Sequence, residues 1–126
     1  MKKLFLIFGV VLVLSCSKDY KKMIVGTWEC VEENSNIQTE KFTNLGRYEC
    51  VLRSGDMMVI GKYTINDDLD LITIDGFIME NGTPKSEHRV QYMIVDLSDD
   101  EMTLDLDYIN SDTNIYKSWF NTYKRK

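Results

Sequence analysis

The strict alternation of apolar and polar residues near the end of the chain is the feature that most limits its fold. Met102-Thr103-Leu104-Asp105-Leu106-Asp107-Tyr108 alternates without a break, which is the period-two signature of a strand with one buried face. Val90–Val95 follows the same pattern. The polar run Ser98–Glu101 between them carries short acceptor side chains that favour a turn. This part of the chain therefore predicts an antiparallel hairpin.

Turn-forming sequences recur at regular intervals along the rest of the chain. They lie at residues 53–56, 66–68, 80–84 and 110–114. The segments between them predict strands near 24–33, 46–53, 57–65, 69–79, 86–97, 101–109 and 114–124, and residues 34–45 fit a loop, a short helix or an eighth strand. This organisation predicts an all-β domain, a small antiparallel up-and-down β-barrel, because closure removes exposed strand edges. A two-sheet β-sandwich is the alternative.

The first residues have the organisation of an export signal. Lys2 and Lys3 precede the apolar run Leu4–Leu14, which is shorter than the roughly 20 residues that a membrane-spanning helix needs and has the proportions of a secretory signal peptide. Val13-Leu14-Ser15-Cys16 resembles a lipobox, which implies removal of residues 1–15 and attachment of a lipid to Cys16. An ordinary signal peptide cleaved nearby is the alternative.

Residues 16–126 are then expected to form a lipid-anchored protein of the cell envelope, with a short polar tether at 16–23 and a single domain at 24–126. Ser17 follows the lipidated cysteine, which implies the outer membrane as the destination. Without Lys2 and Lys3 the chain carries 13 basic and 20 acidic residues, a net charge of −7. An acidic chain repels nucleic acid and anionic lipid heads, so we expect no nucleic-acid partner, and membrane association through the lipid alone.

Two further cysteines are available for pairing in an oxidising compartment. Cys30 follows Trp28 by two positions and Cys50 follows Tyr48 by two, so all four share an inward face if the first two predicted strands are regular neighbours. A disulfide between Cys30 and Cys50 is the expectation. Two buried free thiols that act as small apolar side chains are the alternative.

Ile24-Val25-Gly26-Thr27-Trp28-Glu29 resembles the first strand of lipocalin-like proteins, in which a glycine is followed two positions later by a tryptophan. The remainder of residues 24–126 is similar in outline to the small lipocalin-like domains of Gram-negative lipoproteins. The resemblance implies that Trp28 plugs one end of the barrel and that a basic residue of the last strand, Arg125, packs over it. An ordinary core tryptophan without a cationic partner is the alternative.

No catalytic or metal-binding set is recognisable in the sequence. The single histidine, His88, has no evident nucleophile or orienting partner and is expected to face solvent from a strand. Residues 66–70 place oxygen ligands at alternate positions but lack the glycine and glutamate of an EF-hand, so they predict a solvated turn. Asn81-Gly82 predicts a turn with positive φ. We therefore expect no enzyme, no cofactor and no metal.

Two kinds of function fit such a barrel. The first is a non-catalytic interaction module that binds an envelope protein or a polysaccharide, with Tyr116, Trp119 and Tyr123 as aromatic surface. The alternative is a barrel that binds or carries a small apolar ligand. Its candidate cavity lining comprises residues of one strand parity: Tyr48, Leu52, Tyr63, Ile65, Tyr92, Ile94, Leu104 and Leu106.

Overall fold

The computed structural model describes residues 19–53, 55–110 and 120–126, except for the side chains of residues 106–110. It contains one short helix and eight strands: α2 (Tyr20–Met23), β1 (Gly26–Cys30), β2 (Ile37–Phe42), β3 (Arg47–Leu52), β4 (Met57–Asn66), β5 (Leu71–Glu80), β6 (Thr83–Leu97), β7 (Glu101–Asn110) and β8 (Phe120–Arg125). Each strand pairs with the next and β8 pairs with β1, all antiparallel. The predicted up-and-down barrel is confirmed, and the sandwich is excluded.

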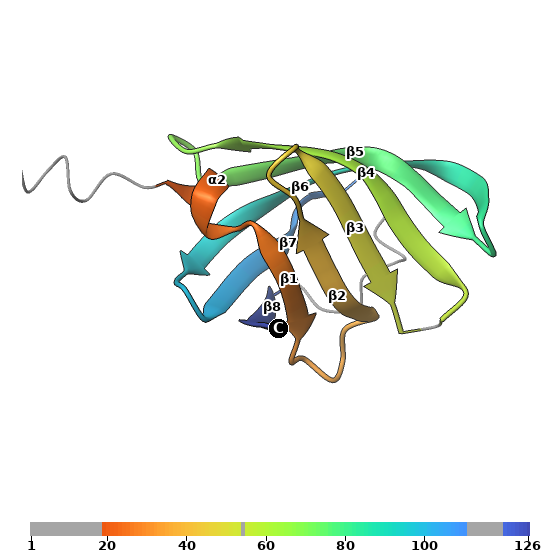
Figure 1. The fold of residues 1–126 in the computed structure, drawn as a ribbon, viewed down its shortest axis with the longest axis horizontal. Coiled ribbons are helices and arrows are strands. Elements are labelled where there is room, and N and C mark those ends of the chain that lie inside the picture. The colour runs from red at the N-terminus through yellow and green to blue at the C-terminus, as the bar shows by residue number, and fades with distance from the viewer. Residues whose placement is uncertain (1–18, 54, 111–119) are drawn as a thin grey trace, which may run out of the picture.

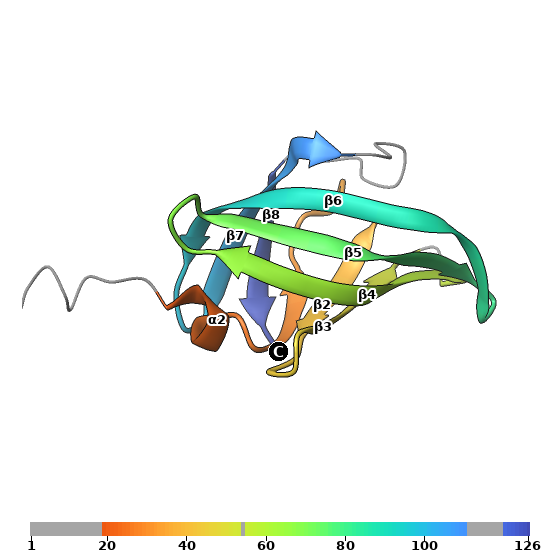
Figure 2. The same cartoon turned by 90° about the horizontal axis from the view of Figure 1, so that it is seen from above.

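The strands are of two lengths, which gives the barrel a long side. β4, β5 and β7 have 10 residues each and β6 has 15, whereas β1, β2, β3 and β8 have 5 or 6. Figures 1 and 2 show the long ribbons of β4, β5 and β6 extending beyond the short strands. We call the end that carries α2 and the turns at 43–46, 67–70 and 98–100 the helix end. The loop end carries residues 31–36 and the β5–β6 turn.

The hairpin turns follow the expected chemistry. Asn81 and Gly82 join β5 to β6 with φ values of 52° and 79°, the positive values that a two-residue hairpin turn requires. In the turn after β4, the Asn66 side-chain oxygen accepts hydrogen bonds from the backbone N–H groups of Asp68, at 3.0 Å, and Leu69, at 3.2 Å. This oxygen therefore stabilises a hairpin turn, as the sequence predicted.

Large buried side chains occupy the described part of the interior. Tyr48, Leu52, Tyr63, Tyr92, Ile94 and Leu104 are all buried, and Ile65 is partly buried against them. Of the expected cavity lining, only the side chain of Leu106 lies outside the description. The largest fully buried side chains are Trp28, Tyr48, Tyr92, Tyr123 and Phe42. Among these rings Phe42 packs at 5.1 to 5.2 Å, between ring centroids, against Tyr63 and Tyr48. The described side chains thus pack the barrel with aromatic rings.

The prediction that His88 faces solvent is wrong, because this side chain is fully buried. His88 pairs in register with Gly76, and Gly76 pairs with Gly61. A Cβ on Gly61 would lie 2.5 Å from the Gly76 Cα, so both positions require glycine, and neither places a side chain in the interior. The His88 side chain points inward from β6, and its imidazole occupies interior space that side chains at positions 61 and 76 would otherwise take.

Part of the segment expected as a tether has regular structure. Tyr20–Met23 forms one helical turn, and both Tyr20 and Ile24 are buried in the core. Tyr20 therefore contributes apolar surface to the helix end. Cys16 lies outside the described residues. No described helix is both long and apolar enough to span a bilayer.

Candidate functional site: a polar chain inside the barrel

At the helix end, Trp28 is fully buried and donates its indole N–H to the carbonyl of Ile24 at 2.8 Å. The guanidinium carbon of Arg125 lies 4.2 Å from the centroid of the Trp28 ring, within the range of a cation–π interaction. Trp28 and Arg125 are register partners in the β1–β8 pair. The contact expected between these two residues is therefore present.

Arg125 also ties three segments together at this end. Its guanidinium donates to the carbonyls of Met23 at 2.6 Å, Val25 at 2.8 Å and Asp99 at 2.6 Å. Gly26 is needed beneath it, because the φ of Gly26 is +138° and a Cβ there would lie 2.6 Å from Arg125 Nη1. The glycine and the tryptophan of the first strand thus belong to one arrangement, in which the glycine makes room for the cation that covers the indole.

Toward the loop end, the barrel wall opens between β1 and β2. The β1–β2 register ends at Glu29 and Thr39, and a β-bulge at 37–39 interrupts the β2–β3 register. A pocket of about 490 Å³ lies here, lined by Glu29, Cys30, Val31, Glu33, Gln38 and Arg53. Bulges of this kind redirect side chains and end strand pairing. Gln38, the extra residue of the bulge, thus lines this opening.

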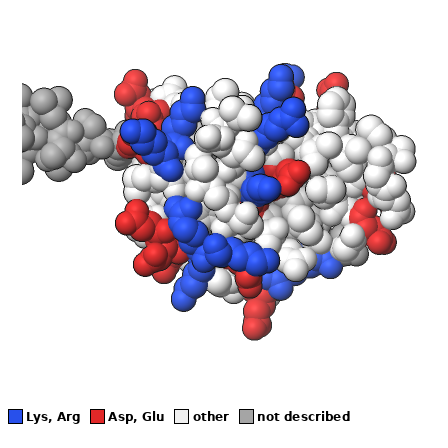
Figure 3. Space-filling view, viewed as in Figure 1, with Lys and Arg blue, Asp and Glu red and all other residues white. Residues whose placement is uncertain are grey.

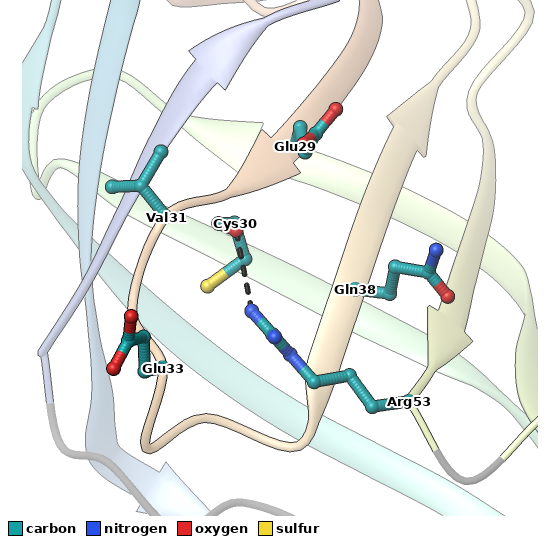
Figure 4. A pocket seen from close by; sticks show the side chains of 6 residues that line it. All are labelled: Glu29, Cys30, Val31, Glu33, Gln38 and Arg53. Atoms are coloured by element: carbon teal, nitrogen blue, oxygen red, sulfur yellow. Dashed lines mark hydrogen bonds between the residues drawn. The ribbon is translucent and has the colours of Figure 1, made fainter.

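Arg53 bridges this opening, as Figure 4 shows. Its guanidinium donates to the carbonyls of Glu32 at 3.0 Å, Ile37 at 3.2 Å and Cys30 at 3.4 Å. All three acceptors are neutral backbone groups at the edges of the loop 31–36. Arg53 therefore holds this loop against the barrel mouth.

Behind the pocket, polar side chains form a line from the loop into the interior, which we call the polar chain: Ser35, Asn121, Tyr123, Glu40 and Tyr48. Asn121 Nδ2 donates to Ser35 Oγ at 2.7 Å and to the Tyr123 hydroxyl at 3.2 Å. The Tyr48 hydroxyl donates to Glu40 Oε1, and the Tyr123 hydroxyl also interacts with this carboxyl group. Every member of the chain is buried. The barrel thus contains a continuous polar path among its aromatic rings.

Glu40 is the ionisable group at the centre of the polar chain. Burial raises the pKa of its carboxyl group to about 7, although its contacts with Tyr123 and Tyr48 favour the charged form. Desolvation dominates because the side chain is fully enclosed. Glu40 therefore changes its charge near neutral pH, more than two units above an ordinary glutamate.

Two acceptors of the polar chain remain unsatisfied. Glu40 Oε2 and Asn121 Oδ1 are buried and have no hydrogen-bond partner in the described part of the chain. A buried polar atom left in this state costs ~1 to 3 kcal/mol. When Glu40 is ionised, both atoms can accept a hydrogen bond from a further N–H or O–H donor.

The expected disulfide is not formed: Cys30 and Cys50 are free thiols, and both are buried. The prediction failed because it treated their strands as neighbours, whereas β2 lies between β1 and β3. Strands are ~4.8 Å apart, so two strand spacings exceed the ~4.4 to 6.8 Å between α-carbons that a disulfide requires. Burial raises the pKa of both thiols, which makes them poor nucleophiles.

The sequence analysis missed Glu40, Asn121 and Ser35. Glu40 alternates with Phe42, and Asn121 alternates with Tyr123, so strand parity alone would have directed both polar side chains inward. The bulge hid this signal in β2, because Ile37 and Glu40 are both buried although an odd number of positions separates them. Of the expected aromatic surface, Tyr123 is instead a core residue, because its β8 parity faces inward. Tyr116 and Trp119 lie outside the described residues.

On the outside of the barrel, one apolar strip crosses three strands, and we call it the outer strip: Val51, Met58, Ile60, Phe77 and Met79. Met58 pairs with both Val51 and Met79, and Ile60 pairs with Phe77. Phe77 is 47% exposed and Val51 37% exposed, and the other three are partly buried. In Figure 3, charged side chains gather over the left and lower parts of this face, with further charged groups at its top and centre, and much of its right part is uncharged.

Comparison of the chain with protein-family models, with curated proteins and with solved structures found no match. The polar chain, the Trp28–Arg125 contact and the outer strip are therefore interpreted from their own geometry.

Proposed function

We propose that this protein is an exported lipoprotein of the outer membrane, anchored through Cys16, whose lipocalin-like barrel acts as a non-catalytic interaction module. The outer strip is the observation that carries this proposal, because it leaves methionine, isoleucine and phenylalanine side chains together on the barrel wall. Interaction surfaces are enriched in methionine and aromatic residues and depleted in charge at their centre. An apolar patch of this composition favours a protein partner over a polysaccharide.

The position of the strip relative to the anchor supports the same function. Val51, Met58 and Met79 lie near the loop-end limits of their strands, whereas α2, the described segment nearest to Cys16, lies at the helix end. A barrel tethered by its helix end would hold the strip away from the membrane. The large aromatic side chains buried in the described interior also favour binding on the outside over transport of an apolar ligand within.

Two experiments test the two halves of the proposal. Labelled fatty acid is expected on the wild type in a Gram-negative host and to be absent from Cys16→Ala, which tests the anchor. A photo-crosslinking residue at position 77 is expected to capture one envelope protein, and the added substitution Ile60→Asp is expected to abolish the product. Val95 is the matched control, because it is 54% exposed on β6 near the helix end, outside the strip. Equal crosslinking from positions 77 and 95 would reject the strip as the interface.

A further inference from the structure

The unsatisfied acceptors of the polar chain point to a ligand. We propose that Glu40 and Asn121 bind one small cation of the ammonium class, either free ammonium or the head of a primary amine, which enters through the pocket between β1 and β2. This site is separate from the outer strip and lies on the opposite side of the barrel wall. It concerns an inner face that the proposed interaction function does not use.

The hydrogen bonds require that the ligand be a donor. Both amide hydrogens of Asn121 are directed to acceptors, at Ser35 Oγ and the Tyr123 hydroxyl. Glu40 Oε1 already accepts from Tyr48, and the Tyr123 hydroxyl is also hydrogen-bonded to this carboxyl group. The acceptors that remain are Glu40 Oε2 and Asn121 Oδ1, both on residues with no exposed surface. An ammonium group supplies several N–H donors at once and leaves no new acceptor to satisfy.

The charge requires that the donor be cationic when Glu40 is ionised. The groups whose charge or hydrogen bonds couple to the Glu40 carboxyl come from three strands: Tyr48 and Cys50 on β3, Cys30 on β1 and Tyr123 on β8. These are hydroxyls and thiols, so among the described residues none of these groups brings a positive charge. A buried carboxylate without a counter-charge is strongly unfavourable. A bound cation would neutralise it directly.

The surroundings of the site favour a small, non-metallic group. The neighbouring side chains Tyr48, Tyr123 and Cys50 are all fully or almost fully buried, so only the compact head of a ligand is expected to reach Glu40. Within the described residues, no group of three histidine, cysteine or carboxylate side chains is arranged to hold a metal ion. A small ammonium group matches these limits.

The pocket borders the site through Cys30. Cys30 lines the pocket and interacts electrostatically with Glu40 on its inner side. Glu29 and Glu33 stand at the mouth and favour a cation over an anion there. The one cationic side chain of the lining, Arg53, directs its guanidinium to backbone carbonyls.

The test measures thermal stability of the wild-type protein in ammonium chloride, methylammonium chloride, tetramethylammonium chloride and sodium chloride at equal ionic strength. At pH 8 we expect ammonium to raise the midpoint above the sodium and tetramethylammonium values, since tetramethylammonium has no N–H group. A rise with methylammonium as well assigns the site to amine heads, and a rise with ammonium alone assigns it to the free ion. Equal midpoints in all four salts would overturn the proposal.

Two variants and a change of pH locate the site. Glu40→Gln is expected to remove the ammonium effect, and Glu49→Gln, an exposed neighbour on β3, is expected to retain it. Because the pKa of Glu40 is about 7, about one molecule in a hundred is ionised at pH 5, so the apparent Kd should be ~100-fold weaker there. Calorimetric titration of the wild type measures this ratio. An ammonium effect that survives Glu40→Gln, or a Kd that does not change between pH 8 and pH 5, would contradict the assignment.

Discussion

At the helix end, the side chains of Trp28 and Arg125 donate hydrogen bonds to backbone carbonyls. Inside the barrel, by contrast, Glu40 and Asn121 each have one buried acceptor atom without a donor in the described part of the chain. The two regions are close in the fold, since Trp28 and Glu40 are register partners on β1 and β2. They therefore share one wall of the barrel, but buried polar atoms have hydrogen-bond partners at the helix end and lack some of them in the polar chain.

The difference distinguishes polar groups that stabilise the fold from polar groups that would serve a function. At the helix end, the cation reaches neutral acceptors from an exposed position, and the indole covers the core, so each polar group is matched. In the polar chain, an ionisable carboxyl group is enclosed completely. Unmatched buried groups of this kind oppose stability and persist where something else compensates for them. We therefore expect changes at the helix end to unfold the protein and changes in the polar chain to alter its response to pH.

The largest effect is expected at the helix end. Trp28→Ala should lower the free energy of unfolding by ~3 to 5 kcal/mol, the range for loss of a large buried aromatic side chain. Small domains have only ~5 to 15 kcal/mol in total, so the variant should be close to unfolding. Urea denaturation followed by circular dichroism measures the change. Phe120→Ala, at a side chain 53% exposed, is the control and should change stability by less than ~1 kcal/mol.

The polar chain should show itself in the pH dependence of stability. The pKa of Glu40 is about 7 in the folded protein and 4.5 ordinarily, so the folded state binds the proton more tightly. The contribution of Glu40 to the free energy of unfolding is therefore fully present below about pH 4.5, and it is lost as the pH rises through about 7. The loss should total roughly 3 kcal/mol.

Glu40→Gln removes the titrating group while keeping its shape. Between pH 4.5 and pH 8 the wild type should lose the stability that comes from Glu40, and the variant should not. The decrease in the free energy of unfolding should therefore be smaller for the variant by roughly 3 kcal/mol. Parallel pH profiles for the two proteins, measured by urea denaturation, would show that Glu40 is not the titrating group. Glu49→Gln, at an exposed position on the next strand, should follow the wild type.

A smaller effect is expected from the cation that covers Trp28. Arg125→Ala should cost ~1 to 2 kcal/mol, through the lost cation–π contact and the lost hydrogen bonds to the carbonyls. The double variant with Trp28→Ala should be less unstable than the sum of the single variants, because the two residues share one interaction. Strict additivity in this cycle would mean that the indole and the guanidinium stabilise the barrel independently.

The smallest effect is expected at the cysteines. Because Cys30 and Cys50 are separated by β2, reduction should leave both the intact mass and the unfolding midpoint unchanged in a soluble form that begins after Cys16. Their buried thiols should react with a thiol reagent only slowly until urea unfolds the chain. A mass increase on reduction would show that the two strands approach each other more closely than their register allows.

The fold was largely predictable from the sequence because alternation and turn chemistry act locally. The strands around Val90–Val95 and Met102–Tyr108, and the Asn81-Gly82 turn, follow from residues that are neighbours in the chain. The contact of Trp28 with Arg125 was expected from a resemblance rather than from periodicity. The polar chain could not be predicted in the same way, because the bulge in β2 shifts the parity on which such reasoning depends.

Glu40 illustrates the limit most clearly. Its neighbours in sequence, Thr39 and Lys41, are polar, and the alternation with Phe42 is the one local sign that distinguishes it from a solvated glutamate. Its burial results from contacts with Tyr48 and Tyr123, and Tyr123 lies on the last strand of the barrel. A pKa near 7 is therefore a property of the closed barrel and not of the segment that contains the residue.

The contacts of Arg125 also bear on the order in which we expect the strands to pair during folding. Its hydrogen bonds to Val25 and Met23 join residues 100 and 102 positions apart, and closing a loop of that length costs ~4 kcal/mol of chain entropy. The hairpin of β5 and β6, by contrast, closes across two residues. We therefore expect the central hairpins to form first and the β1–β8 pairing last, with the rate of folding limited by this long-range step. Until then the chain is a curved ribbon whose two free borders are open to pairing with other chains.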